Sequence, residues 1–294
     1  MSGQQTMRSA STSERDVLRP ARAAAGKWSP FDFVGRMTAV VAIRPVAREA
    51  AQAMLPAGLG LAAQHHTPGD RHPLVLILGQ QSNVRPRPLP LGADYLEFLL
   101  AVPFVEHQGR ARHGPFCYCP RLFLDRRLPT VLGRLLYGYA KRRAAIEMTE
   151  NSYRIADLDD GELLLSADFR SAAATVELSR SSAAPFFDLP VIAQAGDSWW
   201  YSFADFGLDR AVVQPVELAL VIHRQFVSGL PVGEFRIAGV EAAAARAFRI
   251  RTSWRLAGPW ARRLPPASGR PEARPRPEPA ASASLTDRRA RAQR

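Results

Sequence analysis

The segment LLYGYAKRRAAIEM, residues 135–148, contains the side chain with the most distinctive chemistry in this sequence, Lys141. The chain has 37 arginines but only two lysines, and the other one, Lys27, lies near the N-terminus. Arginine can replace lysine wherever only a positive charge is needed, but it cannot lose its proton and attack a carbonyl carbon. The single lysine in the body of the chain is therefore a candidate nucleophile.

An amine among apolar side chains, or beside other cations, can have a lowered pKa and be neutral near neutral pH. A neutral amine condenses with a ketone to form a Schiff base, whose protonated form withdraws electrons from a neighbouring bond. The alternative is that a biased composition left one lysine as a surface charge beside Arg142 and Arg143.

Other familiar catalytic motifs are missing. The sequence has no G-x-x-x-x-G-K-[ST] and no G-x-S-x-G segment, and the glycines of GLGLAA (58–63) follow Pro56 rather than a strand. His65, His66, His72, His107 and His113 show no metal-ligand spacing, nor do the two cysteines. We therefore expect neither a nucleotide loop nor a metal.

The net charge of +12 is concentrated at the two ends of the chain. Residues 1–27 carry +3 and residues 261–294 carry +6, so the body from 28 to 260 holds only +3. Both ends are rich in Ala, Ser, Pro and Arg, which favours disorder. We predict a disordered leader (1–27), one domain (28–260) and a disordered tail (261–294). The basic ends are interpreted as solvated segments, with a site for an anionic partner such as nucleic acid as the less favoured alternative.

The location of the protein is inferred from features that the sequence lacks. Cys117 and Cys119 alternate on a predicted strand and are poorly placed to bridge, which favours reduced thiols. No apolar signal segment follows Met1, and no run of 18 apolar residues occurs. We expect a cytoplasmic protein without a membrane span.

Short apolar runs separated by turn residues must position these side chains, and they indicate a mainly β (α+β) fold. Helices are predicted over 45–56, which begins and ends with proline, and over 126–140. A hairpin is predicted through Asp160-Gly161. Strands are predicted over 36–43, 73–81, 95–105, 116–125, 153–158, 162–169, 174–180, 198–206, 216–226 and 247–256.

The segment from YLEFLLAVPFV through FCYCPRLFLD to PTVLGRLLYGYAKRR resembles the acetoacetate decarboxylase family. The matching positions occur in the family's order along the chain: Tyr95, Glu97, Leu124, Asp125, Pro129, Gly133, Arg134, Tyr139 and Lys141. The segment FVGRMTAVVAI is similar to the family's opening strand, and AFRIRTSWRL to its closing strand. Altogether the resemblance covers roughly residues 30–258.

The resemblance implies a closed, cone-shaped antiparallel β-barrel with a few flanking helices, assembled as a homo-oligomer. It also implies that Lys141 forms a Schiff base with a β-keto acid, that Arg36 holds the carboxylate, and that Glu97 positions substrate or relays a proton. Arg142 would be a cationic neighbour that tunes the lysine. Neither a cofactor nor a metal would be needed. Alternatives from the residues alone are a surface role for Arg36 and a solvated strand position for Glu97.

The sequence departs from the family pattern at two places. Ala140-Lys141-Arg142 replaces Pro-Lys-Lys, and no acid stands near Leu78 and Gln80, on a strand where the family carries a second glutamate. Three functions remain open: a decarboxylase acting on a small-molecule keto acid, a Schiff-base aldolase-dehydratase acting on pyruvate-like substrates, and a non-catalytic binding protein whose basic tail contacts anionic partners.

Overall fold

The computed structural model describes residues 32–108, 114–177, 184–195, 198–207, 212–238 and 246–257. The predicted leader and tail lie outside these residues, as does His113, so their disorder stays a prediction. The assignment of residues 28–260 to one domain also stays a prediction.

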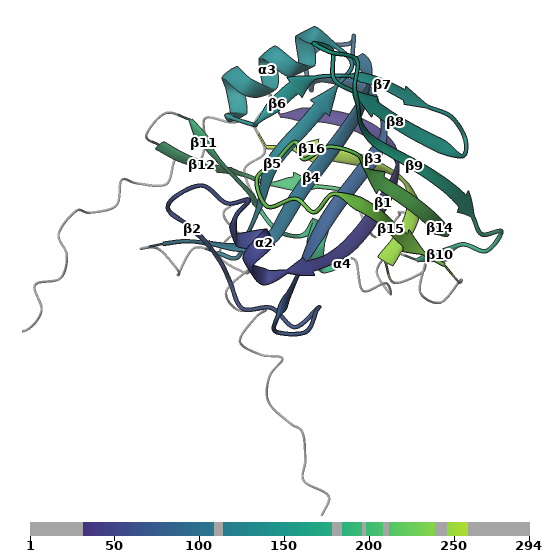
Figure 1. Cartoon of the computed structure of the whole chain (residues 1–294). Coiled ribbons are helices and arrows are strands. Elements are labelled where there is room, and N and C mark those ends of the chain that lie inside the picture. Colours follow the sequence, from purple (N-terminus) through teal and green to yellow (C-terminus); the bar gives the residue numbers. More distant parts are fainter. Residues whose placement is uncertain are drawn as a thin grey trace, which may run out of the picture.

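The described residues are mostly in β-strands, with three helices among them (Figure 1). The helices are α2 (Arg48–Gln52), α3 (Arg127–Tyr137) and α4 (Ala184–Phe187). The strands are β1 (Phe33–Ala47), β2 (Leu59–Leu61), β3 (Arg71–Pro86), β4 (Ala93–His107), β5 (Phe116–Leu124), β6 (Lys141–Arg143), β7 (Ala145–Met148), β8 (Ser152–Ala156), β9 (Leu163–Ser171), β10 (Val176–Glu177), β11 (Val191–Ala195), β12 (Ser198–Ser202), β13 (Ala204–Asp205), β14 (Val212–Ile222), β15 (Gly233–Ile237) and β16 (Ala247–Leu256).

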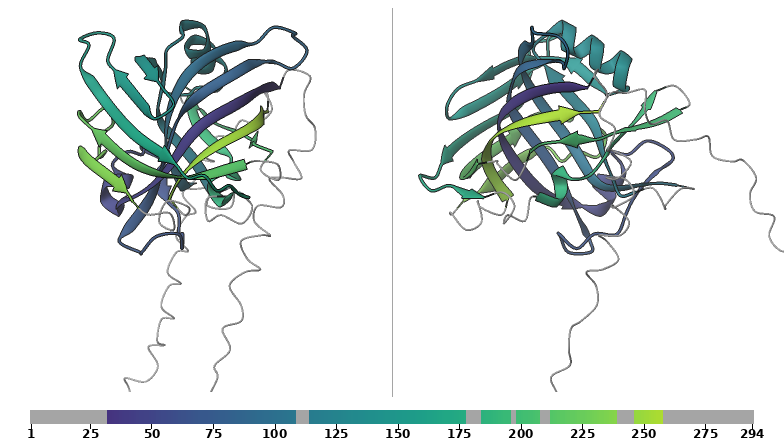
Figure 2. Two further views of the ribbon diagram at one scale, coloured as in Figure 1. Left: turned by 90° about the vertical axis from the view of Figure 1, so that its right-hand side faces the viewer. Right: turned by 180° about the vertical axis from the view of Figure 1, so that it is seen from behind.

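The strands pair along one open path, in the order β12-β11-β5-β4-β3-β1-β16-β14-β9-β8-β7. β1 and β16 lie side by side in antiparallel register, although they are at opposite ends of the described chain. Figure 2 shows that the sheet is strongly curved. The mainly β prediction is confirmed, whereas the closed barrel is not, because no pairing joins β12 to β7 among the described residues.

The antiparallel pairing that the resemblance implies does not extend to every pair of strands, and the exceptions lie at β5. This strand pairs in parallel with β6 on one part of its length and with β11 on another. Parallel neighbours cannot be joined by a tight turn and need a crossover, which is usually a helix. Helix α3 provides that crossover, so β5, α3 and β6 form a β-α-β unit at one end of the sheet (Figure 1).

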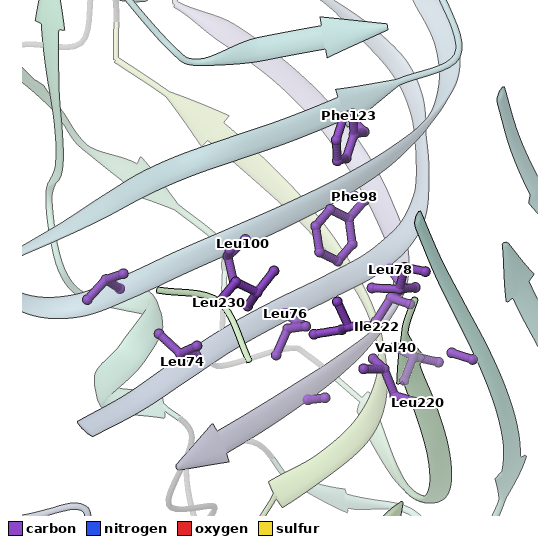
Figure 3. Close-up of a cluster of buried hydrophobic side chains, with 14 of the residues drawn as sticks. Val40, Leu74, Leu76, Leu78, Phe98, Leu100, Phe123, Leu220, Ile222 and Leu230 are labelled. Carbon is purple, nitrogen blue, oxygen red and sulfur yellow. The ribbon is translucent and has the colours of Figure 1, made fainter. Parts of the chain in front are cut away.

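The central strands are buried on both faces, which explains their nearly continuous apolar sequences. On β1, Val40 and Ala42 belong to one buried cluster, and Ala39 and Val41 to another. The first cluster is centred on Leu76, Leu78, Phe98, Leu100 and Phe123 (Figure 3). The second lies on the opposite face of the sheet and includes Met37, Ile77, Tyr95, Cys119 and Leu122.

The helix predicted over 45–56 is much shorter than expected. Strand β1 continues to Ala47, so α2 begins only at Arg48. Among the described residues, β1 pairs with β16 only as far as Ala42, so Pro45 lies beyond the described part of that ladder, where a missing N–H costs no described strand pairing. By contrast, the predicted hairpin is confirmed: β8 and β9 pair in antiparallel register on either side of the Asp160-Gly161 turn.

Candidate active site around Lys141

Lys141 is the first residue of β6, and the β-α-β unit holds it against the sheet. Its backbone pairs with Leu122 of β5. Its side chain lies beneath α3 and is only 10% exposed. A charged side chain is almost never this deeply buried without a partner, so the surroundings of the amine determine what it can do.

Helix α3 covers the lysine with its smallest residue. Thr130, Gly133 and Tyr137 follow each other at helical spacing and are the buried residues of α3. A Cβ added to Gly133 would lie 2.5 Å from Cδ and Cε of Lys141 and 3.0 Å from Nζ. Only glycine therefore permits the helix and the lysine side chain to occupy these positions together.

The partner of the amine is Glu97 of β4. Glu97 Oε1 lies 3.4 Å from Lys141 Nζ, and the glutamate side chain is 11% exposed. The ring of Tyr95, two residues earlier on β4, has its centroid 5.9 Å from the same nitrogen. Because alternate residues of a strand face the same side, Tyr95 and Glu97 both reach the lysine.

Two residues that the sequence did not single out hold Glu97 in place. Gln81 of β3 donates a hydrogen bond from Nε2 to Glu97 Oε2 over 3.1 Å. Trp254 of β16 donates from Nε1 to Gln81 Oε1 over 2.7 Å. Since the indole N–H can only donate, the amide oxygen must face Trp254 and the amide nitrogen must face Glu97.

On β3 the polar side chain that contacts Glu97 is Gln81, whereas Leu78 and Gln80 do not face the site. Leu78 is fully buried in the cluster on the other face of the sheet, and Gln80 is exposed. The register pairs Gln81 with Tyr95 and Gly79 with Glu97. The signal that could have identified Gln81 is strand alternation, because residues 77 and 81 share the face toward the site.

The remaining polar groups of the site are held in their neutral forms. Burial raises the pKa of the Tyr95 phenol well above its usual range, and the nearby Glu97 carboxylate raises it further. Burial likewise raises the pKa of Tyr139, whose hydroxyl lies 2.6 Å from Ser202 Oγ. A hydrogen bond with Cys117, together with burial, raises the pKa of the Cys119 thiol. These groups can hydrogen-bond or donate a proton, but they add no charge.

Two neighbouring cavities share Lys141 as a lining residue. The inner cavity has a volume of about 120 Å³ and is lined by Glu97, Gln81 and Lys141 among mostly apolar side chains. The outer groove has a volume of about 380 Å³ and lies between α3 and the β3–β4 loop. Tyr95, Tyr139, Lys141, Trp254 and Leu256 line both. Among the described residues that line them, Lys141 is the only cation and Glu97 the only carboxylate.

The structure does not bring Arg36 to this site. Arg36 is exposed, whereas its neighbour Met37 is buried and lines the inner cavity. Successive residues of a strand face opposite sides, so Arg36 points away from Lys141. The predicted contact between Arg36 and a substrate carboxylate is therefore not supported by this geometry.

Arg142 is also directed away from the lysine. Its guanidinium Nη2 lies 3.1 Å from Asp157 Oδ1 and 2.7 Å from Asp159 Oδ2. Asp157 pairs in addition with Arg224. Arg142 thus belongs to a separate ion-pair cluster on the other side of β6, and its predicted role as the cation beside the amine is wrong for this reason.

Two further features were searched for over the described ranges. No group of three or more His, Cys, Asp or Glu side chains in them is placed to hold a metal ion. No helix within them is both long and apolar enough to cross a bilayer.

The mostly β fold is shared with solved structures of acetoacetate decarboxylase-like proteins. Residues 18–198 match the family described as acetoacetate decarboxylase, and the chain therefore belongs to this family. No match was found among curated proteins.

Solved structures with the same fold include an acetoacetate decarboxylase from Legionella pneumophila subsp. pneumophila str. Philadelphia 1. It is 14% identical, with a TM-score of 0.53 over 81% of this chain and 88% of that one. The enduracididine biosynthesis enzyme MppR, complexed with the condensation product of pyruvate and imidazole 4-carboxaldehyde, is 14% identical, with a TM-score of 0.52 over 78% and 88%. An acetoacetate decarboxylase-like enzyme from Sphingomonas wittichii RW1 is 14% identical, with a TM-score of 0.50 over 81% and 94%. At these identities the likeness concerns the fold alone.

Proposed function

We propose that this protein is a carbon–carbon lyase that decarboxylates a β-keto acid through a Schiff base on Lys141. The observation that carries the proposal is the nearly buried amine of Lys141, 3.4 Å from the Glu97 carboxylate and facing a cavity. Membership of the acetoacetate decarboxylase family supports the same chemistry.

The reaction begins when the lysine Nζ, after giving a proton to Glu97, attacks the ketone carbon. Water leaves and a protonated Schiff base (iminium) forms. The bond to the carboxylate then breaks, CO2 departs, and the electron pair enters the iminium to give an enamine. A proton returned through Glu97 adds to the enamine carbon. Hydrolysis releases a methyl ketone and regenerates the amine.

The surroundings of the lysine favour the charge changes in this sequence. The electron-rich face of the Tyr95 ring lies near the nitrogen that becomes the iminium. Gln81 fixes Glu97 with one N–H of its amide, and a primary amide carries a second N–H for a substrate oxygen. The mostly apolar lining keeps water away from the carboxylate and so favours its loss as neutral CO2.

The absence of an arginine from the described cavity lining also bears on the choice of substrate. A pyruvate-like substrate keeps its carboxylate throughout an aldol condensation and needs a lasting cationic partner. A β-keto acid loses its carboxylate as CO2. Before that step, the iminium on Lys141 is the only cation that the reaction requires. This difference favours decarboxylation.

One observation supports the aldolase-dehydratase as a second candidate. Gln81 places an amide beside Glu97, where paired carboxylates would shape the proton relay of a decarboxylase. Schiff-base formation does not depend on that second acid, so condensation of a pyruvate-like substrate with an aldehyde stays possible for the same lysine.

The proposal is tested by measuring CO2 and methyl ketone release from a β-keto acid, with a blank for spontaneous decarboxylation. The wild-type protein should exceed the blank, and Lys141→Arg, which keeps the charge but cannot form a Schiff base, should equal it. Equal rates for the two proteins would overturn the mechanism. An adduct with pyruvate and no CO2 release would favour the second candidate.

A further inference from the structure

We propose that the outer groove binds the hydrocarbon chain of the substrate, so that the protein prefers β-keto acids with a long apolar chain to acetoacetate. This inference rests on the proposed function and adds a substrate class to it. It is carried by the shape, lining and position of the groove.

The groove lies between helix α3 and the loop that joins β3 to β4. Leu128, Leu132 and Leu136 line it from the helix, and Leu89 and Leu91 from the loop. Lys141, at the inner end, is the only charged side chain among the described residues of the lining. Binding of a hydrocarbon chain to such a surface is favourable because the chain leaves water. The surface has no side chain that could pair with a second charged group of the substrate.

Most of the exposed leucines among the described residues gather at this groove. Among the described residues, nine large apolar side chains are exposed, and four of these line the groove: Leu89, Leu91, Leu128 and Leu132. Helix α3 packs on the protein through Thr130, Gly133 and Tyr137 instead. An apolar surface that is left open between two elements indicates a binding site rather than part of the core.

The groove lies next to the site of chemistry. Tyr95, Tyr139, Trp254 and Leu256 line both cavities, and so does Lys141. The outer groove, at about 380 Å³, is roughly three times as large as the inner cavity, at about 120 Å³. A ketone carbon bonded to Lys141 can therefore place the carboxylate in the inner cavity and a chain in the groove. Acetoacetate, with only a methyl group on that side, would leave the groove empty.

The test measures CO2 release from a series of β-keto acids of increasing chain length, each corrected for spontaneous decarboxylation. Burial of one methylene contributes about 0.8 kcal/mol, which corresponds to about a fourfold rise in kcat/KM per added methylene until the groove is filled. The paired variant Leu91→Asn/Leu128→Asn should flatten this series, because it places amides on both walls. These side chains are 85% and 64% exposed, so their replacement does not disturb the core.

The matched control is Leu135→Asn/Leu158→Asn, which replaces two exposed leucines, 77% and 46% exposed, that line neither cavity. Its chain-length series should equal that of the wild type. If the wild-type protein decarboxylates acetoacetate and kcat/KM does not rise for the longer β-keto acids, this inference is overturned. The proposed function is left intact by that result. No Schiff base with any β-keto acid would instead reject the proposed function. The oligomeric mass of the groove variant is measured by light scattering. If that mass changes while the dependence of kcat/KM on chain length does not, the groove is a contact between copies of the chain and the inference is overturned.

Discussion

Replacing Gly133 by alanine tests whether α3 and Lys141 are in contact as described. The new Cβ would lie 2.5 Å from Cδ and Cε of the lysine, whereas carbon atoms normally approach to about 3.5 Å. The lysine side chain must therefore move by about 1 Å. A displacement of this size at a reacting group costs about 10²-fold in rate, so we expect CO2 release in a single turnover to fall by about that factor.

The same substitution should not destabilise the fold. The atoms that the new methyl group meets belong to a flexible side chain, and Gly133 lies inside a helix, where alanine is favoured by about 0.5–1 kcal/mol. Urea unfolding should therefore show equal or slightly greater stability. Gly69→Ala is the matched control, because a Cβ there meets nothing within 4 Å, and its rate should be unchanged. A wild-type rate in Gly133→Ala would refute the placement of the amine under α3.

Three further predictions concern other parts of the molecule. Gln81→Glu should add an ionisation to the pH profile of kcat/KM, because two carboxylates in contact share a proton; an unchanged profile would contradict the contact with Glu97. Burial lowers the pKa of His72 from 6.5 to about 4, so the unfolded chain binds a proton at a higher pH than the native one. Above pH 6.5 His72 is neutral in both states, and the free energy of unfolding should fall by up to about 3 kcal/mol as the pH is lowered from 6.5 to 4. Urea unfolding measures this loss, and an equal loss in His72→Gln would contradict the prediction. Arg36→Gln and Arg142→Gln should each keep kcat/KM within about twofold, since both side chains point away from the amine, and a tenfold loss in steady-state assays would place either one in the site.

The sequence predicted the part of the site that depends on local pattern and residue chemistry. Lys141 stood out because lysine is so rare in this chain, and the helix predicted over 126–140 corresponds to α3. Glu97 followed from the resemblance. These features lie within about 45 residues of one another, and each depends on its own segment.

The rest of the site depends on strand phase and on contacts between distant segments. Gln81 and Trp254 are 173 positions apart and meet only because β3 and β16 flank β1 on its two sides. A one-residue change of phase decides which side chains face the cavity. Met37 rather than Arg36, and Gln81 rather than Gln80, are the residues on that face. In strands that are apolar on both faces, the sequence pattern does not show which residues face the cavity.

The direction of β6 was missed for a similar reason. Three residues, Lys141–Arg143, are too short to show a periodic pattern, and their parallel pairing with β5 follows from the α3 crossover. Alternation along β6 explains why Arg142, next to the inward-facing Lys141, faces the acidic side chains of Asp157 and Asp159 rather than the cavity.

The central claim is that Lys141 forms a Schiff base with a keto acid. The direct measurement is peptide mass mapping after the protein has been incubated with a β-keto acid and reduced with borohydride, with Lys141→Arg as the control. We predict one reduced adduct, on Lys141, in the wild type and none in the variant. An unmodified Lys141 with every keto acid tried, or the same adduct in both proteins, would contradict the account.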